Sequence, residues 1–181
     1  MAFSVQDDNG SVVDANAYID VAFFNTYHSD RNVTDVVDGN FELLDVQGAI
    51  VLASDYLDSR YSYVGERRSS LQTTEWPRFD AVDRDDYVVF GVPTIIKEAC
   101  ADLALAELKQ AGSLFPDITF DSTGQGIKRI KNKLDVLENE IEYFGGNSPQ
   151  SAQKSPIFYQ ADWRLKRSGL LLSRRRLVRG G

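Results

Sequence analysis

The segment over residues 93–112 constrains the fold most, because its middle, ACADLALA, is small and apolar almost all round. Pro93 suits the first turn of a helix, where its missing N–H costs nothing, and Gly112 suits the end of one. Small side chains let neighbouring helices approach closely, so such a helix is buried on more than one side. The sequence therefore predicts a core helix here.

Three other segments also have helical spacing. Residues 14–29 place apolar side chains three and four positions apart, with Asp14 as the cap, and residues 41–60 repeat the pattern. Further on, IFYQADWRLKRSGL from residue 157 is amphipathic, with Ala161 and Leu165 on its apolar side. Three to four helices are therefore expected.

Residues 113–156 have a mixed pattern. FPDITFDSTGQG reads as extended chain, whereas residues 127–144 fit a polar helix by their Glu and Lys content or a two-stranded piece by their alternation. We favour strands, which predicts a short β-hairpin within residues 118–144. GGNSPQSAQKSP, residues 145–156, has the composition of a linker.

These patterns predict a mainly α fold: a small helical bundle with a long ordered loop and an extended C-terminal arm. With 181 residues and 43% apolar content, the chain can bury a core as one ordinary domain. We expect a helical body over residues 1–112 with the loop at 61–91, an extended or β segment with a linker over 113–156, and a basic arm over 157–181.

The loop at residues 61–91 is far longer than the median connection of about five residues, and such loops are usually functional or disordered. Its aromatic side chains can pack it onto the helices, so we expect order. Trp76 and Pro77 would fasten it to the body, and Arg78 would pair with nearby carboxylates. The residues predicted to brace the body and to contribute to a subunit interface are Tyr61, Arg67, Trp76, Pro77, Arg78, Asp83, Arg84 and Asp85.

Charge is uneven along the chain. Residues 161–181 carry seven basic side chains against Asp162 alone, a net charge of +6, so the first 160 residues sum to −13 within the total of −7. An acidic body with a basic tail suggests that the tail binds an acidic partner or nucleic acid, although a solvated chain end has the same composition.

Nucleic-acid binding has mixed support in the sequence. The run KRIKNK at residues 128–133 and the tail could both follow phosphates. Trp76, Phe79 and Tyr87, however, lie in acidic surroundings that repel a phosphate backbone. We therefore do not expect interleaved basic and aromatic side chains.

The common catalytic and cofactor motifs are missing. Cys100 and His28 are the single cysteine and histidine, too few for a zinc cluster, and no phosphate-loop, dinucleotide, hydrolase or zinc-protease motif occurs. We therefore expect no enzyme activity, no cofactor and no metal. His28 is more typical of a packed position than of a catalytic base, although a spatial pair with Cys100 stays open.

The carboxylates from Asp80 to Asp86 raise the question of a metal. An EF-hand loop starting at Asp83 fails at once, because its fifth and sixth positions are Tyr87 and Val88. A looser Mg²⁺ or Ca²⁺ site, and with it a metal-assisted hydrolase, is the weakest of our function hypotheses.

No membrane or export signal is visible. No stretch approaches the roughly 18 consecutive apolar residues of a membrane helix. The start, MAFSVQDDNG, has neither the basic residues nor the apolar run of a signal peptide. We expect a protein made in a cytoplasm, without a membrane partner.

One long stretch resembles a known family. The run LASDYLDSRYSYVGERRSSLQTTEWPR, followed by VDRDDY and VPTIIKEACADLALAEL, is similar to head-to-tail adaptor proteins of tailed bacteriophages, which are often catalogued as DnaT-like single-stranded-DNA-binding proteins. DANAYIDVAFFNTY near the start and RRRLVRGG at the end also resemble that family. The likeness covers most of the chain, and residues 127–156 depart from it.

The resemblance implies a structural virion protein in the neck between capsid and tail. It would form a ring with itself, usually twelve-fold, under the portal protein, bridge the portal to a tail-side connector or tail-completion protein, and let double-stranded DNA pass. An acidic body suits such a channel. The predicted portal-docking arm comprises Trp163, Arg164, Leu165, Arg174, Arg175, Arg176, Leu177 and Arg179.

The rival hypothesis is a single-stranded-DNA-binding replication protein. Binding of oligonucleotides that weakens steeply with salt and depends on Trp76 or Trp163 would support this hypothesis. Such binding needs cations that pair with the phosphates and aromatic rings that stack with the bases. Neither hypothesis requires a cofactor.

Overall fold

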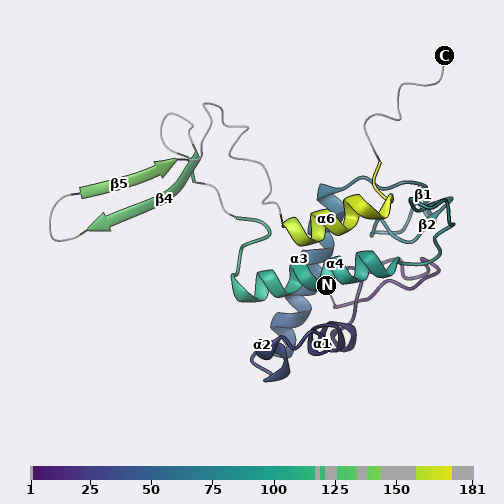
Figure 1. The fold of residues 1–181 in the computed structure, drawn as a ribbon, viewed down its shortest axis with the longest axis horizontal. Coiled ribbons are helices and arrows are strands. Elements are labelled where there is room, and N and C mark those ends of the chain that lie inside the picture. The colour runs from purple at the N-terminus through teal and green to yellow at the C-terminus, as the bar shows by residue number, and fades with distance from the viewer. Residues whose placement is uncertain (1, 117–118, 121–125, 134–137, 144–157, 173–181) are drawn as a thin grey trace, which may run out of the picture. The chain divides into compact units, whose positions relative to one another are not determined.

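The computed structural model describes residues 2–116, 119–120, 126–133, 138–143 and 158–172. The chain divides into two compact units, Met1–Leu114 with Ile157–Gly181 and Phe115–Pro156. In Figure 1 the first unit holds the helices and the second holds a small antiparallel sheet. The predicted mainly α fold is confirmed.

Two helices, α3 (Leu43–Arg60) and α4 (Thr94–Lys109), pack against each other at the centre of the first unit. Pro93 is the N-cap of α4, as its lack of an N–H favours. Small side chains on both helices let the backbones approach closely, and those that are buried are Ala49, Ala53, Ala99, Cys100, Ala101 and Ala104. The predicted core helix is confirmed. Within the described part of the chain, no helix is long and apolar enough to span a membrane.

Helix α1 (Val21–Ser29) begins six residues later than the sequence predicted, and Asp20, not Asp14, caps it. The Asp20 carboxylate accepts a hydrogen bond from the N–H of Phe23 at 2.7 Å. The residues before it are not helical: Ala17 forms a β-bridge with Val5, and the N–H of Tyr18 donates to Ser54 Oγ at 3.2 Å instead of to a helix carbonyl. A one-turn helix, α2 (Thr34–Val37), follows α1.

The loop over residues 61–91 is ordered, as predicted. In it, β1 (Glu66–Arg67) pairs antiparallel with β2 (Arg78–Phe79). Arg67 Nη1 donates to the carbonyl of Gln72 at 3.2 Å and so closes the turn between the two strands.

Helix α6 (Tyr159–Ser168) packs on α4 and ends at Gly169. Gly169 has a φ of +79°, and a Cβ there would lie 2.5 Å from the backbone N of Arg84, so only glycine fits. Tyr61 supports the helix from the loop, since its hydroxyl donates to Asp162 Oδ1 at 3.2 Å. The first part of the predicted arm is therefore a helix within the body.

The second unit holds three strands in the order β3-β4-β5: β3 (Thr119–Phe120), β4 (Gly126–Lys133) and β5 (Glu138–Tyr143). β4 and β5 pair antiparallel, with Ile130 opposite Ile141. The expected hairpin within residues 118–144 is confirmed, and the polar-helix alternative is wrong.

Candidate nucleic-acid interface

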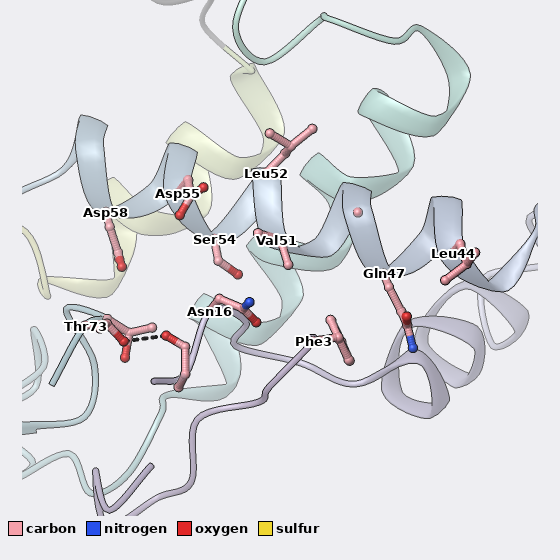
Figure 2. Close-up of a pocket in the computed structure, with 13 residues that line it drawn as sticks. Phe3, Asn16, Leu44, Gln47, Val51, Leu52, Ser54, Asp55, Asp58 and Thr73 are labelled. Atoms are coloured by element: carbon pink, nitrogen blue, oxygen red, sulfur yellow. Dashed lines mark hydrogen bonds between the residues drawn. The ribbon is translucent and has the colours of Figure 1, made fainter. Parts of the chain in front are cut away.

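A groove with a volume of about 670 Å³ runs along α3, and we call it the α3 groove. Figure 2 shows it between α3, the N-terminal segment and Thr73 of the loop. Its lining has an apolar part and a carboxylate part, formed by Phe3, Leu44, Val51 and Leu52 and by Asp55 and Asp58, respectively.

Asp58 joins this groove to the loop. Its carboxylate accepts hydrogen bonds from the Tyr18 hydroxyl and, at 3.1 Å, from the N–H of Glu75. Burial raises the pKa of Asp58 to about 7, although both donors act to lower it. The Tyr18 oxygen also accepts from the N–H groups of Glu75 and Trp76, at 3.0 and 3.2 Å. A buried acid and a phenol therefore fix the start of the WPR stretch to α3.

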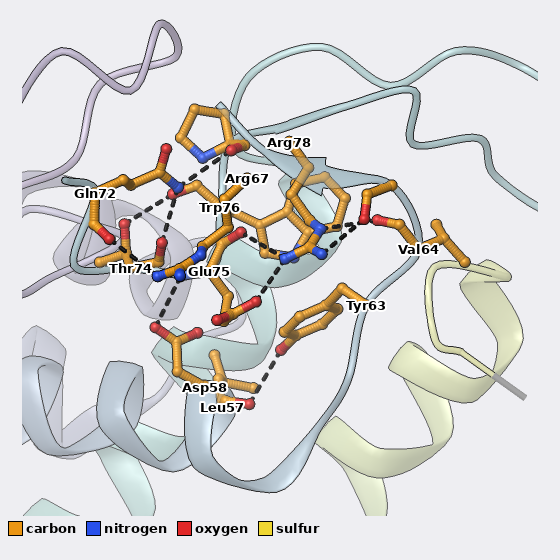
Figure 3. Close-up of polar contacts among 12 residues, drawn as sticks. Leu57, Asp58, Tyr63, Val64, Arg67, Gln72, Thr74, Glu75, Trp76 and Arg78 are labelled. Atoms are coloured by element: carbon orange, nitrogen blue, oxygen red, sulfur yellow. Dashed lines mark hydrogen bonds and ion pairs between the residues drawn. The ribbon is translucent and has the colours of Figure 1, made fainter. Parts of the chain in front are cut away.

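Trp76 is fully buried beneath the loop, with 0% of its surface exposed. Figure 3 shows its ring near that of Tyr63, and the two centroids are 5.6 Å apart in an edge-to-face arrangement. Thr74 Oγ1 donates to the carbonyl of Trp76 at 2.8 Å. The next peptide bond is cis, and the Pro77 carbonyl accepts from Gln72 Nε2 at 3.1 Å. Trp76 is thus a core residue, out of reach of a nucleic-acid base.

Arg78 ties both sides of the loop together (Figure 3). Its Nε donates to the carbonyl of Val64 at 2.9 Å and its Nη2 to that of Gly65 at 2.7 Å. Its Nη1 lies 2.5 Å from Glu75 Oε2. A planar guanidinium suits such a site, because it offers several donors in a fixed geometry.

The loop's aspartates form a turn. Asp83 Oδ1 accepts from the N–H groups of Asp85 and Tyr87, at 2.9 and 3.0 Å. Arg84 lies 3.5 Å from Asp85 at the surface, and its N–H donates to the carbonyl of Ser168 at 3.0 Å. Among the residues that the structure describes, no group of three or more His, Cys, Asp or Glu could hold a metal ion.

His28 and Cys100 do not form the nucleophilic pair that the sequence left open. His28 Nε2 lies 3.1 Å from the carbonyl of Ala101, and burial lowers the pKa of His28. Cys100 Sγ instead lies 3.5 Å from Ser54 Oγ, and burial raises the pKa of the thiol to about 12. A thiol that stays protonated is a poor nucleophile.

The exposed side of α6 combines aromatic and basic side chains. Tyr159 is 80% exposed and Trp163 is 68% exposed, and Lys166 and Arg167 are exposed in the following turn. Positions i, i+4, i+7 and i+8 lie on one side of a helix, so the four side chains share a surface. We call these four residues the α6 face.

The other side of α6 is fixed to α4. Leu165 is fully buried, and Arg164 pairs with Glu98 and, at 3.4 Å, with Asp102 of α4. Both residues were predicted for the portal-docking arm; in the structure Leu165 packs inside the body and Arg164 is paired with α4. The remaining predicted arm residues lie outside the described part of the chain: Arg174, Arg175, Arg176, Leu177 and Arg179.

Sequence reasoning missed Tyr159, Lys166 and Arg167, and it was wrong to expect no interleaving of rings and cations. The signal was present in YQADWRLKR, where aromatic and basic residues recur at helical spacing. Exposure alone separates these side chains from buried neighbours such as Ala161 and Leu165.

A family model described as "Putative DnaT-like ssDNA binding protein" matches residues 1–174. No curated protein and no solved structure matches the chain. The family match corrects our expectation of a structural bacteriophage connector, with its ring, portal and DNA-ejection roles, because the matching family is described by single-stranded-DNA binding. It corresponds instead to the rival hypothesis.

Proposed function

Because the chain belongs to the DnaT-like ssDNA-binding protein family, we propose that it binds single-stranded DNA through the α6 face. The observation that supports this most is the exposure of Tyr159 and Trp163 one helical turn apart, on the same side as Lys166 and Arg167. Sequence-independent binding of a single strand needs these two elements, rings for the bases and cations for the phosphates.

The two rings supply the stacking part of the interaction. Side chains four positions apart on a helix have Cβ atoms about 5 to 6 Å apart, so Tyr159 and Trp163 can each meet a base of one strand. Stacking of a base on an aromatic ring contributes about 1 to 3 kcal/mol. Both rings are already exposed, so binding requires no opening of the core.

The two cations supply the electrostatic part. Lys166 Nζ lies 2.5 Å from Asp162 Oδ2, and the Asp162 side chain is 11% exposed, whereas that of Lys166 is 65% exposed. A phosphate can therefore approach the Lys166 ammonium from solvent and share it with Asp162. No ion pair with another described residue involves Arg167, which leaves its guanidinium for a phosphate.

The loop over residues 61–91 is unsuited to the same role. Trp76 is buried, and the exposed ring of Tyr87 belongs to a turn that also carries Asp83, Asp85 and Asp86. Carboxylates repel a phosphate backbone, so rings alone do not make this turn a binding surface. We propose that the loop maintains the fold and that binding involves no catalysis.

The experiment is a fluorescence-anisotropy titration of a labelled oligothymidine with the full chain, in about 50 mM and about 200 mM salt. Trp163→Ala and Tyr159→Ala should each weaken binding by about 5-fold to 100-fold. Lys166→Gln and Arg167→Gln should each weaken it less and make it less sensitive to salt.

Tyr87→Ala is the matched control, since Tyr87 is 72% exposed and Tyr159 is 80% exposed. It removes the same ring from an acidic surface and should leave the affinity unchanged. If Tyr159→Ala and Trp163→Ala bind as the unaltered protein does, or lose no more than Tyr87→Ala, the α6 face is not the binding surface.

A further inference from the structure

The α3 groove lies on the side of α3 that faces away from the core. Its lining residues Leu44, Val51, Asp55 and Asp58 follow one another at three-, four- and seven-residue steps, which is one helix face. The buried α3 residues, such as Ile50 and others that pack toward α4, occupy the opposite face. Helix α3 therefore presents a second, partly apolar face that no described segment covers completely.

The groove changes character along its length. Leu44 is 77% exposed and Leu52 is 38% exposed, so large apolar side chains remain open to solvent near the start and the middle of α3. The carboxylates of Asp55 and Asp58 lie toward its C-terminal end (Figure 2). None of the residues that line the groove is basic, so the two acids have no cationic neighbour within it.

The described chain ends near the C-terminal end of α3. The N–H of Leu172 donates to the carbonyl of Ser62 at 2.8 Å, and Ser62 follows the last residue of α3, Arg60, by two positions. The nine residues after Leu172 read SRRRLVRGG and carry four arginines and no acid. Extended, nine residues span up to about 30 Å.

We propose that the segment from Arg174 to Val178 docks in the α3 groove of its own chain. Its order matches that of the groove: the three arginines come first and would meet Asp55 and Asp58, and Leu177 and Val178 follow. Guanidinium groups pair with carboxylates through two parallel hydrogen bonds, which suits the exposed carboxylate of Asp55 at the acidic end.

The lengths agree with this order. Leu177 is the fifth residue after Leu172, about 16 Å away in extended chain. Val51 lies nine residues before the end of α3 at Arg60, about 14 Å along the helix axis. Ser62, which binds Leu172, lies two residues beyond Arg60, so the path to Val51 is about 20 Å, and the nine residues after Leu172 are long enough to cover it.

Docking would also regulate the proposed function, and this consequence rests on single-stranded-DNA binding. The arginines that meet Asp55 and Asp58 are cations that could otherwise pair with phosphates beyond the α6 face. DNA and the groove would then compete for the tail, so that weakening the groove strengthens binding of DNA.

The docking test needs no DNA, so its outcome is independent of the proposed function. Two full-length variants are compared by ¹⁵N NMR: Arg174→Gln with Arg175→Gln and Arg176→Gln, and, as a control for charge, Arg129→Gln with Lys131→Gln and Lys133→Gln. The tail variant should shift the amide signals of the residues that line the groove, among them Val51, Leu52 and Asp55. The control variant should not.

Equal shifts in both variants, or none in either, would overturn the proposal. Shifts that disappear on dilution of the unaltered protein would show that the tail of a second copy occupies the groove, which contradicts docking within one chain.

The regulatory part is tested with DNA by a matched pair on α3. Asp55→Asn removes a groove carboxylate, and Asp45→Asn removes an exposed carboxylate of the same helix that does not line the groove. Asp55→Asn should tighten binding to oligothymidine about 3-fold or more, beyond the effect of Asp45→Asn. If the two variants change the affinity for DNA equally, the change follows from net charge alone, and the proposed competition between DNA and the groove is wrong.

Discussion

The loop over residues 61–91 and helix α6 contain the same residue types, and the fold uses them in opposite ways. In the loop, Trp76 is buried and Arg78 is held by backbone carbonyls. On α6, Trp163 stands in solvent, and Arg167 is exposed beside it. Tryptophan and arginine therefore indicate function only once their burial and hydrogen-bond partners are known.

The two regions should respond differently when these side chains are removed. Removal of Arg78 would leave the partly buried carbonyls of Val64 and Gly65 without their donor, and removal of Trp76 would leave a cavity. Removal of either exposed side chain from α6 leaves only solvent in its place. The loop should thus determine stability and the α6 face should determine binding, and the following predictions test this contrast.

Trp76→Ala should give the largest change, lowering the free energy of unfolding by about 3 to 5 kcal/mol. Urea unfolding followed by far-UV circular dichroism measures it. Trp76→Phe should cost less, because a ring remains and the indole N–H that is lost has no hydrogen-bond partner. If Trp76→Ala lowers the free energy of unfolding by less than about 1 kcal/mol, Trp76 behaves as a surface residue does, and the contrast between the loop and α6 fails.

Arg78→Ala should lower the free energy of unfolding by about 2 to 3 kcal/mol, since the carbonyls of Val64 and Gly65 lose their donors. Arg78→Lys should recover little of this loss, because one ammonium cannot reproduce the guanidinium fork. Urea unfolding followed by far-UV circular dichroism measures the free energy of unfolding of both variants. Full stability of the lysine variant would mean that only the charge opposite Glu75 matters.

Asp58 should make stability depend on pH. The carboxyl ionises at its ordinary pKa of 3.8 when unfolded and at about 7 in the fold, so folding takes up a proton between these values. The free energy of unfolding should therefore be highest below about pH 4 on account of this group and fall by about 1 kcal/mol per unit as the pH rises to about 7.

Asp58→Asn provides the control for this pH dependence, since an amide does not titrate. Its free energy of unfolding should lack the decline that Asp58 causes between about pH 4 and 7. Chemical unfolding at several pH values measures both proteins. An equal slope in the two would assign the dependence to other groups, such as Asp55, whose pKa is also raised by burial.

Trp163→Ala should give the smallest change in stability, within about 0.5 kcal/mol, because solvent already surrounds the ring. The same variant should weaken DNA binding, as proposed above. A large loss of stability would show that Trp163 has a structural role like that of Trp76, and the contrast between the two regions would fail.

The sequence by itself determined the elements that depend on local chemistry. The alanine-rich stretch after Pro93 predicts α4, and the 3.6-residue spacing of residues 41–60 predicts α3, because periodicity and capping are properties of neighbours in the chain. The aromatic content of the loop likewise predicts its order. Local rules failed where distant contacts compete with them. The helical spacing from Asp14 runs through Tyr18, whose N–H is instead bound by Ser54 outside any helix.

Only the tertiary structure decided which tryptophan is buried and which is available. Trp76 and Trp163 each lie among charged neighbours in the sequence, and nothing local distinguishes them. Burial depends on what the rest of the chain places against a side chain. Tyr63 packs against the Trp76 ring and the Tyr18 oxygen accepts from the Trp76 N–H, whereas α6 turns Trp163 outward because Leu165 faces the core. Residue types and spacing are local, and exposure is a property of the whole packed body.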